Sequence, residues 1–214
     1  TITEDTTIHL FCILQTRGHR QTRRVMKTHL IFPTPIAQDS IESDLEQYVT
    51  DLSHSDGGVN FSNKGGYQSK HFFKPEKEFQ DLWEKIEKKL NIYHKEVARL
   101  KGHVEINEWW FNVNHKGCAN RQHHHPNSLH SGVYYIKTPN NSGDICFPNP
   151  NQTIYWGWPG GLHEESNQLN SGIVSLTPRK NILFIFPSWA NHSVDPNLSD
   201  EPRISLSFNT GLIQ

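Results

Sequence analysis

The second half of the chain is a succession of short segments in which polar and apolar residues alternate. From about residue 104 these segments are rich in aromatic and β-branched residues, and turns containing Gly, Pro and Asn separate them. A period of two places successive side chains on opposite faces, so each segment is predicted to be a half-buried β-strand. The expected strands are Glu105–Asn114, Ser131–Ile136, Asp144–Phe147, Gly172–Thr177, Asn181–Phe186 and Arg203–Asn209.

Two amphipathic helices are expected before these strands. The first carries an apolar stripe over residues 41–52 and follows Asp39 and Ser40, which are favourable N-cap residues. The second carries a stripe over residues 79–90 with Lys and Glu on the opposite side. Helices followed by many strands predict a mainly β (α+β) domain, in which the helices pack outside an antiparallel barrel or sandwich.

The N-terminal residues lack such periodicity. Residues 1–25 are rich in Thr and Arg, and the only methionine, Met26, follows them. We therefore expect residues 1–25 to be an extension of uncertain role and residues 26–214 to form a single domain. An amphipathic N-terminal helix packed on the barrel is the alternative.

Charge and composition exclude several classes of protein. Lys and Arg number 21 against 22 Asp and Glu, so there is no overall basic field, and no nucleic acid partner is expected. No apolar run approaches 18 residues, so no membrane partner is expected. The three cysteines, Cys12, Cys118 and Cys146, show no CxxC spacing. Unpaired thiols favour a cytoplasmic location over a disulfide scaffold.

Histidine is in excess, with 14 residues, and three are consecutive at positions 123–125 before Pro126. If the strand continues here, His123 and His125 share a face and can bind one metal ion, while His124 points away. Pro126 would end the strand near the mouth of a barrel. An isolated HxH pair is also common in solvated loops, so this pattern alone is weak.

Two further segments add chemistry. His192 follows the apolar run Leu183–Phe186 and a Pro-Ser turn. In the last strand, alternation places Arg203 and Ser205 on one face, a pair suited to a bound carboxylate: the guanidinium offers a fork of donors and the hydroxyl adds another. The alternative for this face is plain solvent exposure. The intervening turn brings the last strand back beside His192, so the joint pattern favours a metal site with an anion site nearby.

Taken together, these motifs resemble the Fe(II)/2-oxoglutarate dioxygenase superfamily, and in particular its small bacterial and phage branch. The matching elements are His123-His124-His125-Pro126, Ser131-Gly132-Val133-Tyr134-Tyr135, Phe186-Pro187-Ser188-Trp189, His192 and Arg203-Ile204-Ser205. The resemblance covers roughly residues 28–212. It implies a double-stranded β-helix (jelly-roll) fold, Fe(II) and 2-oxoglutarate as cofactors, O2 as co-substrate, and hydroxylation as the reaction.

The resemblance also implies the residues of the site. His123, His125 and His192 would bind iron, and Arg203 and Ser205 would hold the distal carboxylate of 2-oxoglutarate. Asn112 and Tyr134 are candidates for contacting the cosubstrate, although both could equally be structural strand residues.

One position departs from the family pattern. Most of the superfamily binds iron through two histidines and a carboxylate, and His125 stands where that carboxylate is expected. A three-histidine site is the preferred interpretation. The alternatives are a two-histidine site completed by water, or a remote acid such as Asp144 or Glu108.

Two other functions compete with this interpretation. One is a cupin-type three-histidine enzyme that does not use 2-oxoglutarate, and the other is a non-catalytic jelly roll that binds a metal or a glycan. The substrate is expected to be a small molecule or a peptide, and a homodimer is left open. The loop Asn149–Asn170, with Trp156 and Trp158, is long enough to act as a lid over the site.

Overall fold

The computed structural model describes residues 30–151, 153–158 and 160–212, of which residues 34 onward belong to one compact unit. The expected N-terminal extension, residues 1–25, lies outside the described residues. Within the described residues, no helix has both the length and the apolar character that crossing a bilayer requires.

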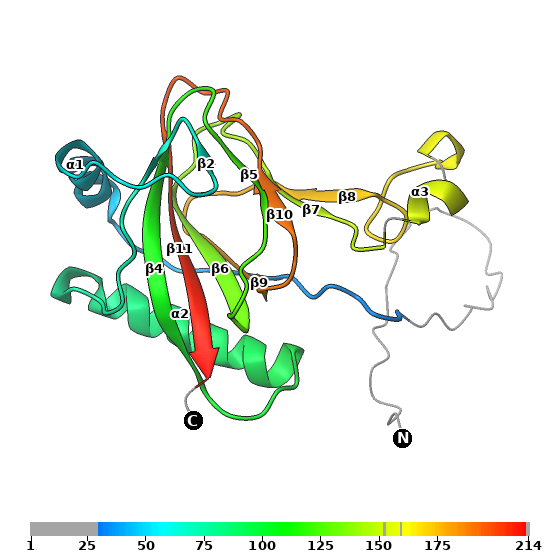
Figure 1. Cartoon of the computed structure of the whole chain (residues 1–214), viewed down its shortest axis with the longest axis horizontal. Coiled ribbons are helices and arrows are strands. Elements are labelled where there is room, and N and C mark those ends of the chain that lie inside the picture. The colour runs from blue at the N-terminus through cyan, green and yellow to red at the C-terminus, as the bar shows by residue number, and fades with distance from the viewer. Residues whose placement is uncertain (1–29, 152, 159, 213–214) are drawn as a thin grey trace, which may run out of the picture. The chain divides into compact units, whose positions relative to one another are not determined.

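Two antiparallel sheets form the body of this unit (Figure 1). The six-stranded sheet has the order β1 (Ala37–Ser40), β9 (Ile182–Pro187), β6 (His130–Lys137), β11 (Arg203–Leu212), β4 (Val104–Asn114) and β3 (Tyr67–Gln68). The five-stranded sheet has the order β2 (Asn63–Lys64), β5 (Ala119–His123), β10 (His192–Val194), β7 (Ile145–Pro148) and β8 (Ile173–Leu176). The predicted jelly-roll fold, mainly β with N-terminal helices outside, is confirmed.

The main core lies between the six-stranded sheet and the helices. The helices are α1 (Glu46–Ser55) and α2 (Gln80–Ile92), with the short turns η1 (Lys77–Phe79) and η2 (Tyr93–Val97) at the two ends of α2. Along β4, Trp109, Phe111 and Val113 face this core, where they meet the apolar stripe of α2. The opposite face of β4 is thereby left to the space between the two sheets.

The first predicted helix begins later than expected. Asp39 and Ser40 are not N-caps but pair with Leu183 and Ile182 as part of β1. The amide of Ile41 donates to the carbonyl of Asn181, 2.9 Å away, so the helix begins only at Glu46. The second helix lies where it was expected. The structure adds the short strands β5 and β10, which carry two of the histidines of interest.

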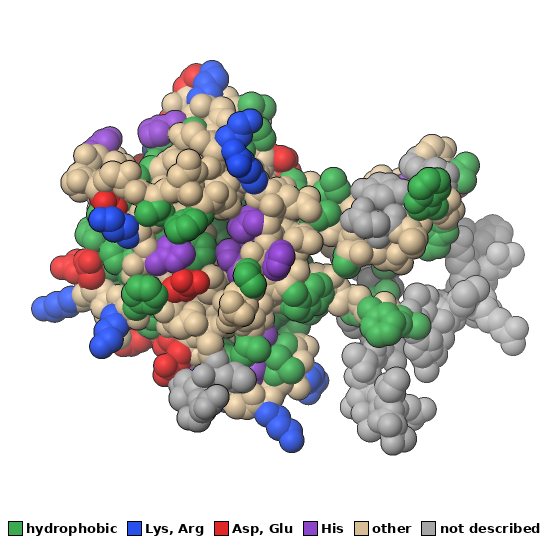
Figure 2. All heavy atoms as spheres, viewed as in Figure 1, with side chains coloured by type: hydrophobic (Ala, Val, Ile, Leu, Met, Phe, Trp, Pro, Cys, Tyr) green, Lys and Arg blue, Asp and Glu red, His purple; other side chains and the backbone are tan. Residues whose placement is uncertain are grey.

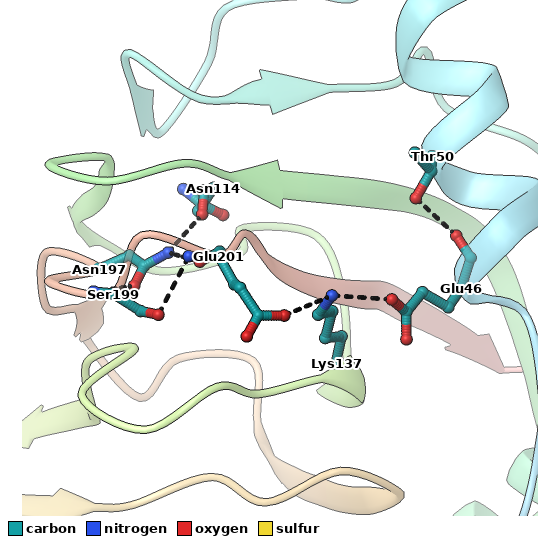
Figure 3. A network of polar contacts seen from close by, with 7 residues as sticks. All are labelled: Glu46, Thr50, Asn114, Lys137, Asn197, Ser199 and Glu201. Atoms are coloured by element: carbon teal, nitrogen blue, oxygen red, sulfur yellow. Dashed lines mark hydrogen bonds and ion pairs between the residues drawn. The ribbon is translucent and has the colours of Figure 1, made fainter.

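A polar network fixes the turn that leads into β11 (Figure 3). The ammonium of Lys137 lies 2.8 Å from a carboxylate oxygen of Glu46 in α1 and 2.9 Å from one of Glu201. Asn197, fully buried, donates to the carbonyls of Asn114 and Glu201, both at 2.8 Å. Because Arg203 follows this turn directly, the network sets where β11 begins.

A buried histidine pair joins η2 to the start of β6. His94 Nδ1 and His130 Nε2 are 2.9 Å apart, and His94 Nε2 lies 3.0 Å from the carbonyl of Lys101. A carbonyl only accepts, so His94 carries its hydrogen on Nε2 and its Nδ1 accepts from His130. His130 Nδ1 is then a buried acceptor without a partner in the structure.

This pair predicts that acid destabilises the protein. Burial, helped by the neighbouring His94, lowers the pKa of His130 to about 4, whereas the unfolded chain titrates near 6.5. Between these two pKa values, the residue binds a proton in the unfolded state but stays neutral in the folded state. The contribution to the free energy of unfolding is therefore complete above pH 6.5 and falls by about 3 kcal/mol towards pH 4.

Urea unfolding of the metal-free protein at several pH values measures this effect. His130→Gln keeps a neutral donor for His94, and we expect it to show a shallower decline in stability below pH 6.5 than the wild type. His115, which is exposed, provides the matched variant His115→Gln, which should keep the full decline. Equal pH dependence in all three proteins would contradict the prediction.

Candidate metal centre and cosubstrate cavity

Three histidines meet where β5 ends and β10 begins. His123 and His192 are directly opposite each other in the β5–β10 pairing, and His125 lies two residues beyond the end of β5. One ring nitrogen from each lies within 4.8 Å of the others. Figure 2 shows histidine side chains gathered on the face over these two strands. The sequence-predicted trio is therefore brought together.

Hydrogen bonds set which nitrogen each ring presents. His123 Nδ1 lies 2.7 Å from the carbonyl of Arg121, and His192 Nδ1 lies 3.0 Å from the carbonyl of Ala190. Carbonyl oxygens only accept, so both rings carry hydrogen on Nδ1 and leave Nε2 as a free lone pair. This is the usual way in which an outer partner orients a metal-binding imidazole. The amide of His125 donates to the carbonyl of Ser188 at 2.9 Å, which holds its loop against the strand that leads to His192.

Burial keeps these imidazoles neutral. It lowers the pKa of His192 to about 4 and that of His125 to about 3, and the neighbouring histidines add to both effects. Neutral imidazole is the form that binds metal, so the lone pairs are available at neutral pH without a proton having to leave. The donor set therefore fits Fe(II), for which imidazole is a suitable ligand.

No carboxylate joins this cluster among the described residues. Glu108 instead lies 2.9 Å from His71 and 2.6 Å from Asn209 through its two oxygens. Asp144 likewise lies outside the group of possible ligands. The interpretation with a remote acid at the metal thus has no support in the geometry.

A cavity between the two sheets adjoins the histidines and contains Arg203 at its wall. Arg203 is 1% exposed. One of its terminal nitrogens, Nη1, donates to the carbonyls of Ser142 and Asp195, while the other, Nη2, is buried without a partner. The hydroxyl of Tyr135 is a second buried group without a partner on the same cavity. Two buried donors without partners beside one cavity cost free energy unless an anion or a water molecule accepts from them.

Ser205 and Asn112, two of the predicted cosubstrate contacts, also line this cavity. They are paired across β11 and β4, which puts their side chains on one face. The amide nitrogen of Asn112 donates to Ser207 at 3.2 Å, leaving its oxygen buried and unpaired. That free atom is an acceptor, so Asn112 suits a water or a substrate donor better than it suits a carboxylate.

Tyr134 does not line the cavity, and its assignment as a cosubstrate contact is corrected. Its side chain belongs to the core beneath the helices, and its hydroxyl bonds the carbonyl of Ile41 at 2.8 Å and the side chain of Asn181 at 2.9 Å. Tyr135, the next residue, points the other way and takes the place expected for Tyr134. The pairing of Ser205 with Tyr135 across β11 and β6 places both side chains on the cavity face. Because the two strands are far apart in the chain, the sequence alone does not reveal this register.

The remaining predicted features lie away from the cavity. His124 is exposed, as expected. The loop expected to act as a lid runs beyond β7 and β8, where it forms α3 (Ile154–Gly157) and the turn η3 (Gly160–Leu162). None of its described residues lines the cavity.

A jelly roll with a histidine cluster beside a buried arginine could hold a metal ion and an anion side by side. Residues 108–209 match the family model described as "Putative 2OG-Fe(II) oxygenase". This similarity covers just under half of the chain, and the family is named for its dependence on Fe(II) and 2-oxoglutarate. A search of curated proteins finds no match to it.

Solved structures share the fold at low sequence identity. A prolyl-4-hydroxylase from Pseudomonas putida is 15% identical with a TM-score of 0.57, covering 85% of this chain and 94% of that one. The viral collagen prolyl hydroxylase vCPH from Paramecium Bursaria Chlorella virus-1 is 14% identical with a TM-score of 0.54, covering 83% and 96%. This chain spans only 51% of a 2OG-Fe(II) oxygenase family oxidoreductase from Burkholderia pseudomallei, at 12% identity, TM-score 0.43 and 56% coverage of this chain.

Proposed function

We propose that this oxygenase couples the oxidative decarboxylation of 2-oxoglutarate to the hydroxylation of a small molecule or a peptide. His123, His125 and His192 would hold Fe(II), and Arg203, Ser205 and Tyr135 would hold the distal carboxylate of 2-oxoglutarate. When bound, iron and 2-oxoglutarate supply the oxygen activation that protein side chains cannot provide. The observation that carries the proposal is the pair of unpaired donors, on Arg203 and Tyr135, buried on the cavity that the three histidines border.

The side chains contribute positioning and shielding. His123 and His192 present preset Nε2 lone pairs because backbone carbonyls fix their tautomers. Phe186 and Phe147 stand beside His192, with ring centroids 4.8 and 6.0 Å from its ring, and keep water from that side of the site. The Arg203 guanidinium is fixed before any ligand arrives, since two carbonyls hold Nη1, so binding a carboxylate costs little reorganisation.

The alternatives fit the site less well. A cupin-type enzyme without 2-oxoglutarate has no use for a buried arginine whose free nitrogen faces the metal cavity. A structural zinc site would require a fourth ligand, and the ligand group in the described part of the chain holds only the three histidines.

Anaerobic reconstitution with Fe(II) and 2-oxoglutarate tests the proposal. We expect the visible charge-transfer band of the chelate, followed by formation of succinate when O2 is admitted. If the protein bound Fe(II) but gave neither the band nor succinate, the non-catalytic or cupin-type alternative would replace this one.

The adjacent tyrosines give a matched pair of variants. Tyr135→Phe removes a donor that has no partner among the described residues, so we expect unchanged stability but 2-oxoglutarate affinity weakened by about 1 kcal/mol, roughly fivefold. Tyr134→Phe removes a hydroxyl that is already paired in the core, so we expect about 1 kcal/mol lower stability and unchanged affinity. Thermal unfolding and titration of the charge-transfer band measure both quantities, and the reverse pattern would refute the assignment of Tyr135.

A further inference from the structure

The cavity face of the six-stranded sheet continues past Trp110 as a row of polar side chains from three strands. Trp110 and Ser207 line the cavity and are paired across β4 and β11. Two residues further along, Asn209 is opposite both Glu108 of β4 and Ser131 of β6. Since alternate residues of a strand share a face, this row lies on the same side of the sheet as the metal cavity, at the opposite end from Arg203.

These side chains form one hydrogen-bonded chain. Ser131 donates to the side-chain oxygen of Asn209 at 2.7 Å, and Asn209 donates to one oxygen of Glu108 at 2.6 Å. The other oxygen of Glu108 lies 2.9 Å from Nδ1 of His71, in the segment that follows β3. The chain therefore runs from the buried sheet outward to His71.

The direction of these bonds fixes which nitrogen of a neutral His71 ring carries the hydrogen. The Glu108 carboxylate only accepts, so Nδ1 of the neutral imidazole carries the hydrogen and Nε2 is a bare lone pair. That Nε2 is buried and has no partner in the structure. Leaving a buried acceptor without a donor costs free energy, and none of the described residues donates to this one.

The surroundings suit a cation. Within the described residues, no Lys or Arg forms an ion pair with Glu108, and the nearby Lys70 is paired with Asp56. The side chains of Glu108 and His71 are 28% and 26% exposed, so the pair lies at the edge of the protein surface, with Nε2 itself on the buried side of the ring. Two aromatic rings flank His71: Trp110 is stacked on it at 4.6 Å, and Phe61, itself exposed, lies 5.5 Å away.

We propose that Glu108 and His71 bind a primary ammonium group of the substrate beside Trp110; this substrate class rests on the proposed hydroxylase function. An ammonium has three donors and no acceptor, and the pair offers a carboxylate and a bare imidazole nitrogen. The rings of Trp110 and Phe61 add the aromatic faces that attract cations. Trp110 lies 5.8 Å from His125 between ring centroids, so a substrate anchored here by its amine would reach across Trp110 to the metal centre.

Three probes of one shape test the charge requirement: benzylammonium, benzyl alcohol and benzoate. Calorimetric titration of the full chain, once metal-free and once loaded with Fe(II) and 2-oxoglutarate without O2, measures their affinities. We expect benzylammonium to bind at least tenfold more tightly than the other two. A lysine tripeptide blocked at both ends, run as a fourth ligand, distinguishes a lysyl side chain from a free amine as the source of the ammonium.

Glu108→Gln is the decisive variant because it changes two features without changing size. The substitution removes the negative charge. When the amide oxygen of the introduced glutamine accepts from Asn209, its amide nitrogen donates to Nδ1 of His71, so the hydrogen of the neutral His71 ring moves to Nε2. We expect benzylammonium affinity to fall at least tenfold while benzyl alcohol affinity is unchanged. Glu105→Gln is the control, since Glu105 is an exposed carboxylate of the same strand, and it should bind the probes as the wild type does.

His71→Phe provides an independent variant. It keeps an aromatic ring against Trp110 and removes the acceptor, so it too should lose benzylammonium binding, even if Glu108→Gln fails to fold. Equal affinity for benzylammonium in the wild type and a folded variant overturns the ammonium site. If the charge-transfer band is absent but benzylammonium binding still depends on Glu108, the site stands and the proposed hydroxylase function fails.

Discussion

His192→Ala is expected to abolish Fe(II) binding and, with it, the charge-transfer band and the formation of succinate. His192 is buried at the centre of the cluster, with its ring 4.4 Å from that of His123 and 5.2 Å from that of His125. Removing only the hydrogen-bond partner of a metal-binding histidine typically costs about 10–100-fold in metal affinity, so loss of the ligand itself should cost at least about 100-fold. Titration with Fe(II) under anaerobic conditions measures the loss.

His124→Ala is the matched control. It removes a neighbouring histidine that is exposed and outside the ligand cluster, so iron affinity should stay within a few fold of the wild type. Retained tight iron binding in His192→Ala would refute the metal site.

The same titration decides whether the site uses two or three histidines. If His125→Ala still bound iron tightly, His125 would not be a ligand and water would complete the site.

Arg203→Met is expected to weaken 2-oxoglutarate binding while leaving iron binding in place. Methionine preserves much of the volume but removes a buried cation that lines the cavity and has one terminal nitrogen without a partner. Loss of one partner of a buried charged hydrogen bond costs about 2–5 kcal/mol, which is roughly 30-fold or more in affinity. Iron affinity should be unchanged, because Arg203 is not among the ligand candidates.

Two controls isolate the distal carboxylate. Pyruvate has the chelating 2-oxo acid group but no distal carboxylate, so its weak binding should be the same in Arg203→Met and in the wild type. Arg179, which is exposed, gives the control variant Arg179→Met, which should bind 2-oxoglutarate normally. Because Arg203 also holds two backbone carbonyls, thermal unfolding must show that the variant is folded; a folded variant with normal 2-oxoglutarate affinity would contradict the assignment.

Local patterns in the sequence predicted most of the fold. Period-two alternation identified β4, β6, β9 and β11, and the apolar stripe identified α2, because each of these signals lies within a dozen residues. The start of α1 was wrong because the pairing of Asp39 with Leu183 competes with N-capping, and that contact spans most of the chain. Local propensity contains no information about such a pairing.

The residues of the candidate site were likewise predictable only where the signal is local in the sequence. Arg203 and Ser205 were identifiable because a strand puts alternate residues on one face. His123 and His125 were identified by the same argument, but β5 ends at His123, and His125 reaches the cluster from the segment that follows. Which tyrosine faces the cavity depends on the register of β6 against β11, and the sequence alone led to the wrong neighbour. The hydrogen bond between Asn209 and Glu108 joins residues 101 positions apart, so no local pattern could reveal the row that ends at His71.

Strand β11 has a consequence for how this enzyme can diversify. Its alternate residues Arg203, Ser205, Ser207 and Asn209 all face the space between the sheets, running from the proposed cosubstrate end to the proposed ammonium end. At about 3.4 Å per residue, the two ends are separated by roughly 20 Å of one strand. Substitutions at the Asn209 end can alter substrate choice without disturbing Arg203. Inserting a single residue within the strand, in contrast, would reverse the facing of every residue after it, and would uncouple the two binding sites in one step.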